Sequence, residues 1–403
     1  MHLHPPVRRV RFWGKILLRL NQRGASVVSE GMKLRRCAAA AAAVAGCVLG
    51  LAAPAVAAPA VAQDSTWGPH GLPMATSWPA PDQGIVLSYP SRTPGAKPDL
   101  SVTRNGGRSW RPLGAPPVPY PADNDQPDAI WADGMIAVTD GTQVVVTGDG
   151  GRRWSPVRLR GGPGSAAGRY IARLTIADGR MFALVTAQGG NGSSSATVYS
   201  GAPRGGVLRP VPGLSVTGGI TYGDISAAGP VQVYLGQAYA SARYWYARDG
   251  VHFRPAPLPC PAATRALLGG VRQGHAIALC NGSPSDAGPG QSDKQVWIAP
   301  HLGGTFTPSG PVFVSPNAHG FAAATAQDMT IATAFDLSST SDAGKTWTSR
   351  LGQPNGASWS DLSFPSSKVG VVVCDTIDNS GNQIGTVYRT TDAGRTWPAL
   401  PFG

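Results

Sequence analysis

Glutamate is almost missing from this sequence: among 403 residues it occurs once, as Glu30. Beyond that position the chain therefore has no glutamate to serve as a catalytic or ligand-binding carboxylate, and aspartate is the only acidic side chain there. Helix-like apolar periods are scarce as well. Short β-branched runs instead lie between turn signals rich in the 53 glycines and 37 prolines, which indicates an all-β fold.

An excess of positive charge is also missing once the N-terminus is set aside. Residues 1–57 contain nine of the 34 Lys and Arg residues and one of the 22 acidic residues, so the remainder has a net charge near +4 instead of +12. This balance gives no support for nucleic-acid binding. The remainder also lacks a run of the ~20 apolar residues that a membrane-spanning helix needs, so we expect no transmembrane segment in the mature chain.

The first 62 residues have the pattern of a leader with a secretory signal peptide. Basic residues at 33, 35 and 36 precede an Ala-, Val- and Leu-rich run from Cys37 to Ala53. Two A-x-A cleavage sites follow, at residues 55–57 and 60–62. We therefore expect a secreted, extracellular protein whose mature domain begins at residue 63.

Two features of this leader leave alternatives open. A second basic stretch, residues 8–23, lies upstream of Met32, so either Met32 is the true start or the signal has a long basic extension. Residues 44–47 (VAGC) resemble a lipobox, so a form anchored to lipid through Cys47 is the alternative to free secretion.

An eight-residue pattern recurs along the rest of the chain. Its copies, from clear to decayed, are residues 340–347 (TSDAGKTW), 390–397 (TTDAGRTW), 103–110, 147–154, a shortened copy at 247–253, 299–306 and 201–208. The pattern predicts a hairpin: the aspartate accepts backbone N–H groups, the glycine supplies a positive φ, and the tryptophan of the returning strand packs into the core.

This pattern, S/T-x-D-x-G-x-T/S-W, resembles the Asp-box (BNR repeat) of sialidase-like β-propellers. The resemblance assigns structural roles to Asn105, Trp110, Asp149, Trp154, Asp249, Phe253, Asp342, Trp347, Asp392 and Trp397. The seven closing positions are on average about 48 residues apart, which is the length of four short strands, or one propeller blade. We therefore expect a seven-bladed β-propeller over residues 63–403, with Asp-boxes in the C–D hairpins.

The last repeat shows the expected plan of a blade. Its strands A to D are predicted at residues 359–364, 369–374, 386–390 and 397–400. This order is also similar to the repeats of photosystem II stability/assembly factor proteins, which by analogy implies a third role, as an assembly scaffold at the cell exterior. In a propeller the D–A and B–C connections share one face, opposite the C–D turns, and binding loops are expected there.

The B–C connection of the last blade offers a candidate metal site. Asp375, Asp378, Asn379 and Asn382 could supply hard oxygen ligands to a calcium ion. Their spacing matches no EF-hand loop, and a solvated flexible loop is the alternative. We expect no metal and no cofactor, with calcium as the alternative.

Three cysteines lie beyond the leader. Cys260 follows strand D of the fourth predicted blade and Cys280 ends strand B of the fifth, so both lie on the same face in neighbouring blades. An oxidising exterior allows a bond between them, and we predict a Cys260–Cys280 disulfide. Cys374 ends an apolar run and is expected to be a buried free thiol.

The resemblance raises the question of sialidase activity. Similar sialidases bind the sugar carboxylate with three arginines, one in an F/Y-R-I-P motif, and use an aspartate acid/base and a tyrosine activated by glutamate. Here the nearest arginine motif is residues 91–94 (SRTP), only eleven residues before Asn105, and the glutamate is missing. Another glycoside hydrolase could work with two aspartates, with Asp128, Asp224 and Asp361 as candidates. The alternative is that these acids cap the inner strands by accepting local backbone N–H groups.

The second class of function is a non-catalytic binding module. Aromatic faces stack on sugar rings while Arg and Asp bind hydroxyls, and such side chains recur near the starts of the predicted inner strands. The candidate binding residues are Trp131, Tyr170, Arg173, Tyr222, Arg265, His319 and Trp359. We therefore expect a monomeric, secreted propeller that binds a glycan or an extracellular protein and has no catalytic residues, with a glycoside hydrolase as the alternative.

Overall fold

The computed structural model describes residues 71–121, 126–162, 168–189, 193–237, 240–261, 264–282, 291–352, 358–377 and 383–402. The predicted leader, with Met32 and Cys47, lies outside these residues. No helix in the described part of the chain is long and apolar enough to cross a membrane. A short 3₁₀ turn, η2 (Pro203–Gly205), lies between the strands β11 and β12.

The strands follow one another along the whole described chain. They are β1 (Leu72–Ala80), β2 (Gln83–Tyr89), β3 (Asp99–Thr103), β4 (Arg111–Pro112), β5 (Asp128–Ala132), β6 (Met135–Thr139), β7 (Val144–Thr147), β8 (Ser155–Leu159), β9 (Arg169–Ala177), β10 (Arg180–Gln188), β11 (Ser194–Gly201), β12 (Val207–Gly218), β13 (Thr221–Ser226), β14 (Val231–Gln237), β15 (Ala242–Ala247), β16 (Arg254–Ala256), β17 (Arg265–Arg272), β18 (His275–Asn281), β19 (Gln291–Ala299), β20 (Thr307–Pro316), β21 (Ala318–Ala323), β22 (Met329–Thr333), β23 (Asp336–Thr340), β24 (Thr348–Gly352), β25 (Ser358–Ser363), β26 (Gly370–Ile377) and β27 (Gln383–Thr390).

These strands assemble as antiparallel meanders in which each strand pairs with the next. β1–β4, β13–β16, β17–β20 and β21–β24 form four-stranded sheets, and β25–β27 form a three-stranded sheet. β5–β12 form one eight-stranded sheet, in which two meanders join where β12 pairs in parallel with β8. The predicted all-β fold is confirmed.

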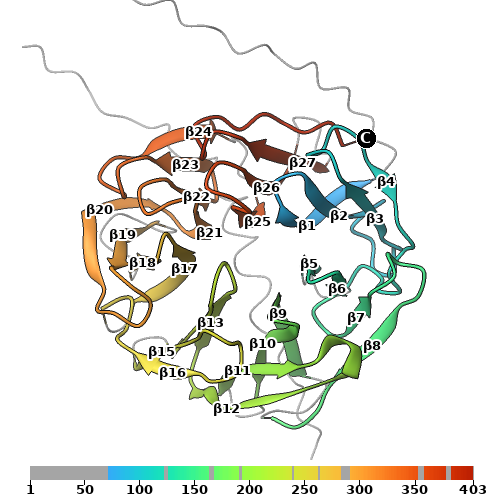
Figure 1. Cartoon of the computed structure of the whole chain (residues 1–403), viewed down its shortest axis with the longest axis horizontal. Coiled ribbons are helices and arrows are strands. Elements are labelled where there is room, and N and C mark those ends of the chain that lie inside the picture. Colours follow the sequence, from blue (N-terminus) through green and yellow to red (C-terminus); the bar gives the residue numbers. More distant parts are fainter. Residues whose placement is uncertain are drawn as a thin grey trace, which may run out of the picture. The chain divides into compact units, whose positions relative to one another are not determined.

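The first strand of each meander lies at the centre of the described part. In chain order β1, β5, β9, β13, β17, β21 and β25 each contact the next, and β25 contacts β1, so the inner strands form a closed ring. Figure 1 shows the sheets arranged around a central opening, with the last strands of the meanders at the rim. This is the arrangement of a β-propeller, which confirms that expectation.

The hydrophobic core lies between neighbouring sheets. One cluster joins Leu72, Ile85 and Leu100 of the first sheet to Ile136 and Val138 of β6. Further clusters lie between the later neighbours in the same way. Each sheet therefore buries its apolar face only when the next sheet is in place, as expected for a repeat architecture.

The last sheet agrees with its predicted plan except at its outer edge. β25, β26 and β27 overlap the predicted strands at residues 359–364, 369–374 and 386–390. The strand predicted at 397–400 is reduced to a single bridge between Tyr388 and Ala399. The prediction was too long because Pro398 and Pro401 have no N–H to donate to a ladder.

Side chains join the first and last sheets. Arg92, after β2, forms an ion pair with Asp375 of β26. The indole N–H of Trp110 donates to the Pro401 carbonyl at 3.0 Å, and the guanidinium of Arg389 donates to the Pro81 carbonyl at 3.0 Å. The ring is thus closed by side-chain contacts as well as by packing between inner strands.

The recurring octapeptides form tight turns. In residues 340–347, Asp342 Oδ1 accepts the backbone N–H of Thr346 at 2.9 Å and the hydroxyl of Thr340 at 2.7 Å. The Thr340 hydroxyl in turn accepts the Gly344 N–H at 3.0 Å, and Gly344 has a φ of 85°. The Thr346 hydroxyl also donates to Asp342 Oδ2 at 2.7 Å, and this bond, followed by those from the Thr346 N–H and the Thr340 hydroxyl, lowers the pKa of Asp342 to about 2. The turn at residues 390–397 repeats the same bonds.

The tryptophans that close these turns differ in burial. Trp397 is 5% exposed and belongs to a core cluster. Trp110, Trp154 and Trp347 are half-buried and pack against the edges of clusters. The prediction that all four are core residues is therefore correct in full only for Trp397.

Candidate functional site

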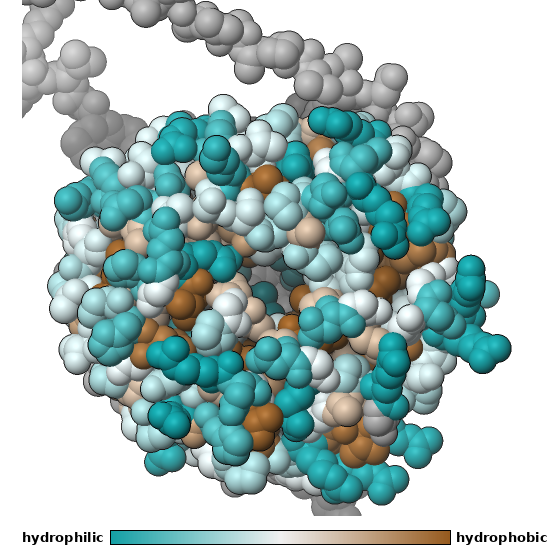
Figure 2. Space-filling view, viewed as in Figure 1, coloured by the Kyte–Doolittle hydropathy of each residue, from teal (hydrophilic) through white to brown (hydrophobic). Residues whose placement is uncertain are grey.

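The inner strands enclose a cavity of about 500 Å³, to which every one of them contributes. Figure 2 shows that the face in view is hollowed at its centre. The ionisable side chains of the lining are Asp128, Asp133, Arg173, Asp224, Arg272, His319 and Asp361, and its aromatic side chains are Trp78, Trp131, Phe321 and Phe364. Ligand pockets usually occupy roughly 300–1,000 Å³, so this cavity is the candidate site.

The three candidate aspartates all line this cavity and link inner strands. Each carboxylate accepts a backbone N–H from the next inner strand: Leu174 to Asp128 at 2.9 Å, Leu268 to Asp224 at 2.8 Å and Thr76 to Asp361 at 2.7 Å. Asp224 also accepts the N–H of Ile225 at 2.9 Å. The carboxylates therefore join adjacent strands across the ring, in addition to any capping of their own strand.

Asp361 lies at an irregular point of β25. Its φ is 53°, and the pairing of β25 with β26 shifts between Ser360 and Ser363. A bulge of this kind redirects a side chain, and aspartate tolerates the left-handed conformation better than most residues. Burial first, and the charge of Asp128 second, raise the pKa of Asp361 to about 8. This carboxyl group therefore holds its proton at neutral pH.

Arg173 of β9 lies among these carboxyl groups. Burial opposes its charge, but Asp224, Asp128 and Asp361 outweigh that effect and raise the pKa of its guanidinium. Burial also raises the pKa of Asp128, and the charge of Arg173 works against that rise. The Arg173 side chain retains exposed surface, which lines the cavity. The three carboxyl groups thus stabilise the positive charge of Arg173 electrostatically.

Arg272, at the end of β17, ties inner strands together at one end of the cavity. Its guanidinium donates to the carbonyl groups of Ala323 at 2.7 Å, Phe364 at 2.7 Å and Ala228 at 3.4 Å. Burial lowers the pKa of Arg272. Sequence reasoning missed this residue because its partners are main-chain carbonyls that only the folded chain brings together.

Three of the predicted binding residues, Trp131, Arg173 and His319, line the cavity. Trp131 is half-buried and also packs against the core cluster between β1 and β6. Burial and the nearby charge of Arg265 lower the pKa of His319, so its imidazole is neutral at pH 7. The cavity thus combines an aromatic ring with neutral and charged hydrogen-bonding groups.

The other predicted binding residues, which do not line the cavity, are Tyr170, Tyr222, Arg265 and Trp359. Tyr222 stacks on Tyr234, with 6.1 Å between ring centroids, and Trp359 is 3% exposed within a core cluster. Arg265 is exposed at the start of β17, and Tyr170 is half-buried in β9. The predicted binding residues therefore do not all share the cavity.

Asp375, the candidate calcium ligand within the described residues, is engaged by Arg92. Asp378, Asn379 and Asn382 lie outside the described residues. Within the described ranges no group of three or more His, Cys, Asp or Glu side chains is arranged to hold a metal ion. The arginine of residues 91–94 thus lies in an ion pair between the first and last sheets.

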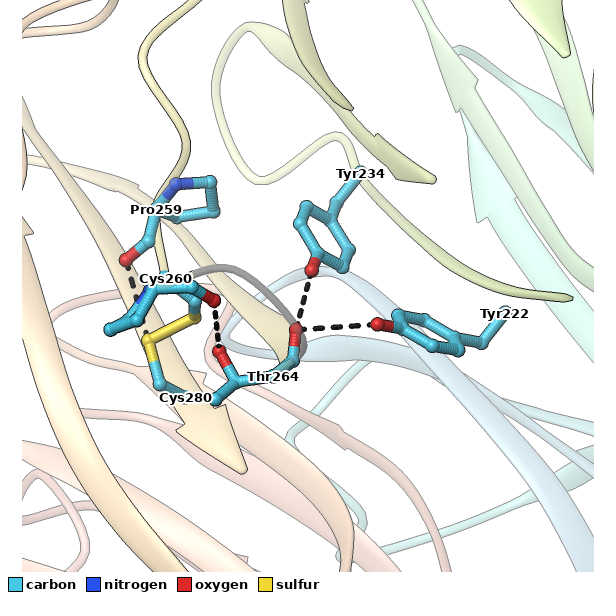
Figure 3. The surroundings of a disulfide bond; sticks show 7 residues. Tyr222, Tyr234, Pro259, Cys260, Thr264 and Cys280 are labelled. Carbon is cyan, nitrogen blue, oxygen red and sulfur yellow. Dashed lines mark hydrogen bonds between the residues drawn. A yellow bond between two sulfur atoms is a disulfide. The ribbon is translucent and has the colours of Figure 1, made fainter. Parts of the chain in front are cut away.

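The predicted disulfide between Cys260 and Cys280 is confirmed, with the two Cα atoms 5.5 Å apart. Figure 3 shows the bond beside Thr264, whose carbonyl accepts the hydroxyls of Tyr234 at 2.6 Å and Tyr222 at 3.4 Å. The disulfide and these tyrosines therefore fix the connection between β16 and β17 from two sides. Cys374 is a buried free thiol, as predicted, and burial raises its pKa to about 12.

No protein-family model matches the chain, and no curated protein matches it. Among solved structures, an ulvan lyase of polysaccharide lyase family PL25, bound to -[GlcA(1-4)Rha3S]-, is 10% identical, with 82% of this chain and 95% of the lyase covered and a TM-score of 0.50. The β-propeller domain of the trilobed protease from Pyrococcus furiosus is 7% identical over 84% and 97% of the chains, with a TM-score of 0.41. A neuraminidase-like protein from a flat-faced bat isolate is 8% identical over 82% and 90%, with a TM-score of 0.42. At these identities the likeness extends to the fold alone, and the propeller-type fold itself follows from the closed ring of inner strands.

Proposed function

We propose that this chain is a secreted, non-catalytic β-propeller that binds a glycan in its central cavity. The observation that carries the proposal is the combination of Trp131, Arg173 and His319 on the wall of one cavity of about 500 Å³. An aromatic ring stacks on a sugar face, and polar side chains bind its hydroxyls. A cavity of this volume suits one or two sugar units better than the broad, flat surface of a protein partner.

The scaffold in this proposal is a seven-bladed propeller over residues 63–403 with Asp-box hairpins. Two observations support it. The inner strands form a ring of seven, from β1 to β25. The turns at residues 340–347 and 390–397 have an aspartate that accepts a backbone N–H and a threonine hydroxyl, as the motif requires.

The hydrogen bonds of the aspartates support a role without catalysis. Asp128, Asp224 and Asp361 each accept a backbone N–H from the neighbouring inner strand at 2.7–2.9 Å. A carboxylate that is needed to satisfy a buried N–H group cannot move freely toward a reacting atom. We therefore assign these side chains to holding the cavity together.

The extracellular location rests on two features. The Cys260–Cys280 disulfide is typical of an oxidising compartment, and the leader has the order of a secretory signal. We propose the free secreted form in preference to an anchor at Cys47, because apolar residues continue past that cysteine.

Titration calorimetry with the purified protein and a panel of soluble oligosaccharides tests the proposal. We expect at least one oligosaccharide to bind, and Trp131→Ala to weaken it about tenfold or more through loss of stacking. Trp131→Phe keeps an aromatic ring and should retain part of the affinity. The exposed Phe335, in the connection between β22 and β23, gives the matched control Phe335→Ala, which should bind as wild type. Absence of binding to the whole panel would contradict the proposal and favour a protein partner.

One observation favours glycoside hydrolysis as a second candidate function. Asp361 and Asp128 both line the cavity, and burial together with the charge of Asp128 raises the pKa of Asp361 to about 8. A protonated acid next to a second carboxylate is the pairing that glycosidases use. In this alternative the panel would release reducing sugars at pH 6–7, and Asp361→Asn would stop that release while leaving oligosaccharide binding measurable.

A further inference from the structure

We infer that the outer part of the eight-stranded sheet is a second binding surface, and that it takes a polyuronate, a sugar chain with a carboxylate on each unit. The surface lies at the rim of the ring, where β8 and β12 pair (Figure 1). None of its side chains lines the central cavity, so binding here is independent of the proposed function. We call this surface the basic rim, and its side chains are Arg152, Arg153, Arg158, Arg160, Arg204 and Arg209.

The basic rim is formed where two meanders join through their outermost strands. β12 pairs in parallel with β8, and Leu208 lies opposite Leu159. Leu208 is buried in the core cluster beneath this joint, and Leu159 packs against the same cluster. Side chains alternate between the two faces of a strand, so the neighbours of these leucines face outward. Arg158, Arg160 and Arg209 are accordingly exposed, on the same face of two neighbouring strands.

The other three arginines extend this surface over the adjoining turns. Arg152 and Arg153 are exposed in the octapeptide turn between β7 and β8, and Arg204 is exposed in η2, just before β12. A Cβ atom placed on Gly148, in the same octapeptide turn, would lie 3.2 Å from Nη2 of Arg204. The guanidinium of Arg204 therefore lies against the turn that contains Arg152 and Arg153, and the six side chains belong to one surface.

The positive charge of the basic rim is not neutralised within the described part of the chain. The ion pairs found there involve Arg92, His252 and Arg395 instead. The acidic residue of the octapeptide turn, Asp149, accepts the backbone N–H of Arg153 at 3.0 Å and so stabilises the turn itself. Like charges on neighbouring strands destabilise a sheet. An anionic partner that spans the joint removes this repulsion.

The surroundings of the basic rim favour a polysaccharide over a membrane or a nucleic acid. Membrane-surface sites insert apolar side chains, but no large apolar side chain is exposed in the described residues of the eight-stranded sheet. Single-stranded nucleic acids stack on exposed aromatic rings, whereas Trp154 is half-buried and its indole N–H donates to the Gly114 carbonyl at 3.1 Å. Guanidinium groups bind carboxylates through paired hydrogen bonds, which fits a chain of uronate units.

The inferred site can be tested with purified protein and four immobilised partners: polygalacturonate, neutral dextran, a DNA duplex and vesicles that contain phosphatidylserine. We expect the wild type to bind polygalacturonate and not dextran. Because the arginines are exposed, salt should screen the interaction, and the affinity for polygalacturonate should fall about tenfold or more between about 50 mM and 500 mM salt.

A triple variant at the joint locates the site. Arg158→Gln, Arg160→Gln and Arg209→Gln together remove the three outward guanidinium groups and keep polar side chains there. This joint variant should bind polygalacturonate about tenfold or more weakly than the wild type. Its affinity for any oligosaccharide of the neutral panel should stay at the wild-type value, because the central cavity is unchanged.

A second triple variant controls for net charge. Arg254→Gln, Lys345→Gln and Lys368→Gln together remove the same charge from exposed positions in three other sheets, and this control variant should bind polygalacturonate as the wild type does. Circular dichroism of each variant confirms that it is folded. Equal loss of affinity in the two triple variants would contradict a site at the joint. Absence of polygalacturonate binding at about 50 mM salt, or tighter binding to the DNA duplex or to the vesicles, would refute a polyuronate partner.

Discussion

Replacing Asp361 by Asn should remove a pH-dependent cost of folding. The pKa of this carboxyl is about 8 in the folded protein and about 3.9 in an unfolded chain, so the unfolded state loses its proton first as the pH rises. Between about pH 4 and pH 8 the folded state binds more protons, and the stability of the wild type falls with rising pH. Four pKa units at about 1.4 kcal/mol each set an upper bound on the order of 5 kcal/mol.

Asparagine isolates the titration from the structural role of the side chain. Its amide oxygen can accept the Thr76 N–H, and asparagine tolerates the positive φ of this position. Alanine tests the other role, because Asp361→Ala leaves that N–H without its acceptor and should cost roughly 1–3 kcal/mol more than Asn at every pH.

Thermal unfolding of wild type and Asp361→Asn from pH 5 to pH 9 measures the effect. As the pH rises to 8, the Tm of Asp361→Asn should increase relative to that of the wild type by up to roughly 7 °C for a domain of this size. Above pH 8 the difference in Tm should stay constant. Asp99→Asn, at an exposed position, should follow the wild-type curve. Parallel curves for wild type and Asp361→Asn would mean that Asp361 is ionised throughout, and would refute the account of the central carboxyl groups.

Three further predictions concern the scaffold. Trp397→Ala should destabilise the protein by roughly 3–5 kcal/mol and Trp347→Ala by less, because only Trp397 is fully buried; equal urea midpoints for the two variants would contradict this. Burial lowers the pKa of Lys294 to about 8, so the free energy of unfolding of the wild type should increase as the pH rises from about 8 to 10.5. Urea unfolding at pH 8 and pH 10 should show this increase for the wild type and not for Lys294→Met. The double variant Cys260→Ser, Cys280→Ser removes a link across 20 residues, and its free energy of unfolding should be about 3 kcal/mol lower than that of the wild type. Two results would contradict this contribution: a variant that melts at the wild-type temperature, or a reductant that lowers the melting temperature of the variant as much as that of the wild type.

Several features could be predicted from the sequence because they depend on local chemistry. The turn at residues 340–347 depends on bonds between residues at most four apart, from Thr340 to Thr346, so its sequence pattern is sufficient to identify the hairpin. The disulfide followed from the repeat count, because the phase of Cys260 and Cys280 within neighbouring repeats placed them on the same face. The outermost strand of the last sheet was predicted too long, because Pro398 and Pro401 have no N–H to donate to a ladder.

The candidate site could be predicted only in part from the sequence. Asp128, Arg173, Asp224 and Asp361 were each identified from their position near an inner strand, and the structure brings all four to one cavity. Their engagement was not foreseen, because each carboxylate reaches a backbone N–H of a different strand, 46 residues on in the case of Asp128 and Leu174. Trp359, like Trp131, lies near the start of a predicted inner strand and was predicted to bind ligand, but it is buried in the core.

The sequence by itself determined the all-β class, the hairpin turns, the disulfide and some of the residues that line the cavity, because these depend on short-range patterns and on a period. The tertiary structure alone decided which side chains share the cavity, which carboxyl group holds a proton and which cation the nearby carboxyl groups stabilise. These properties arise from burial and from the summed charges of several inner strands, and such sums exist only when the ring has closed.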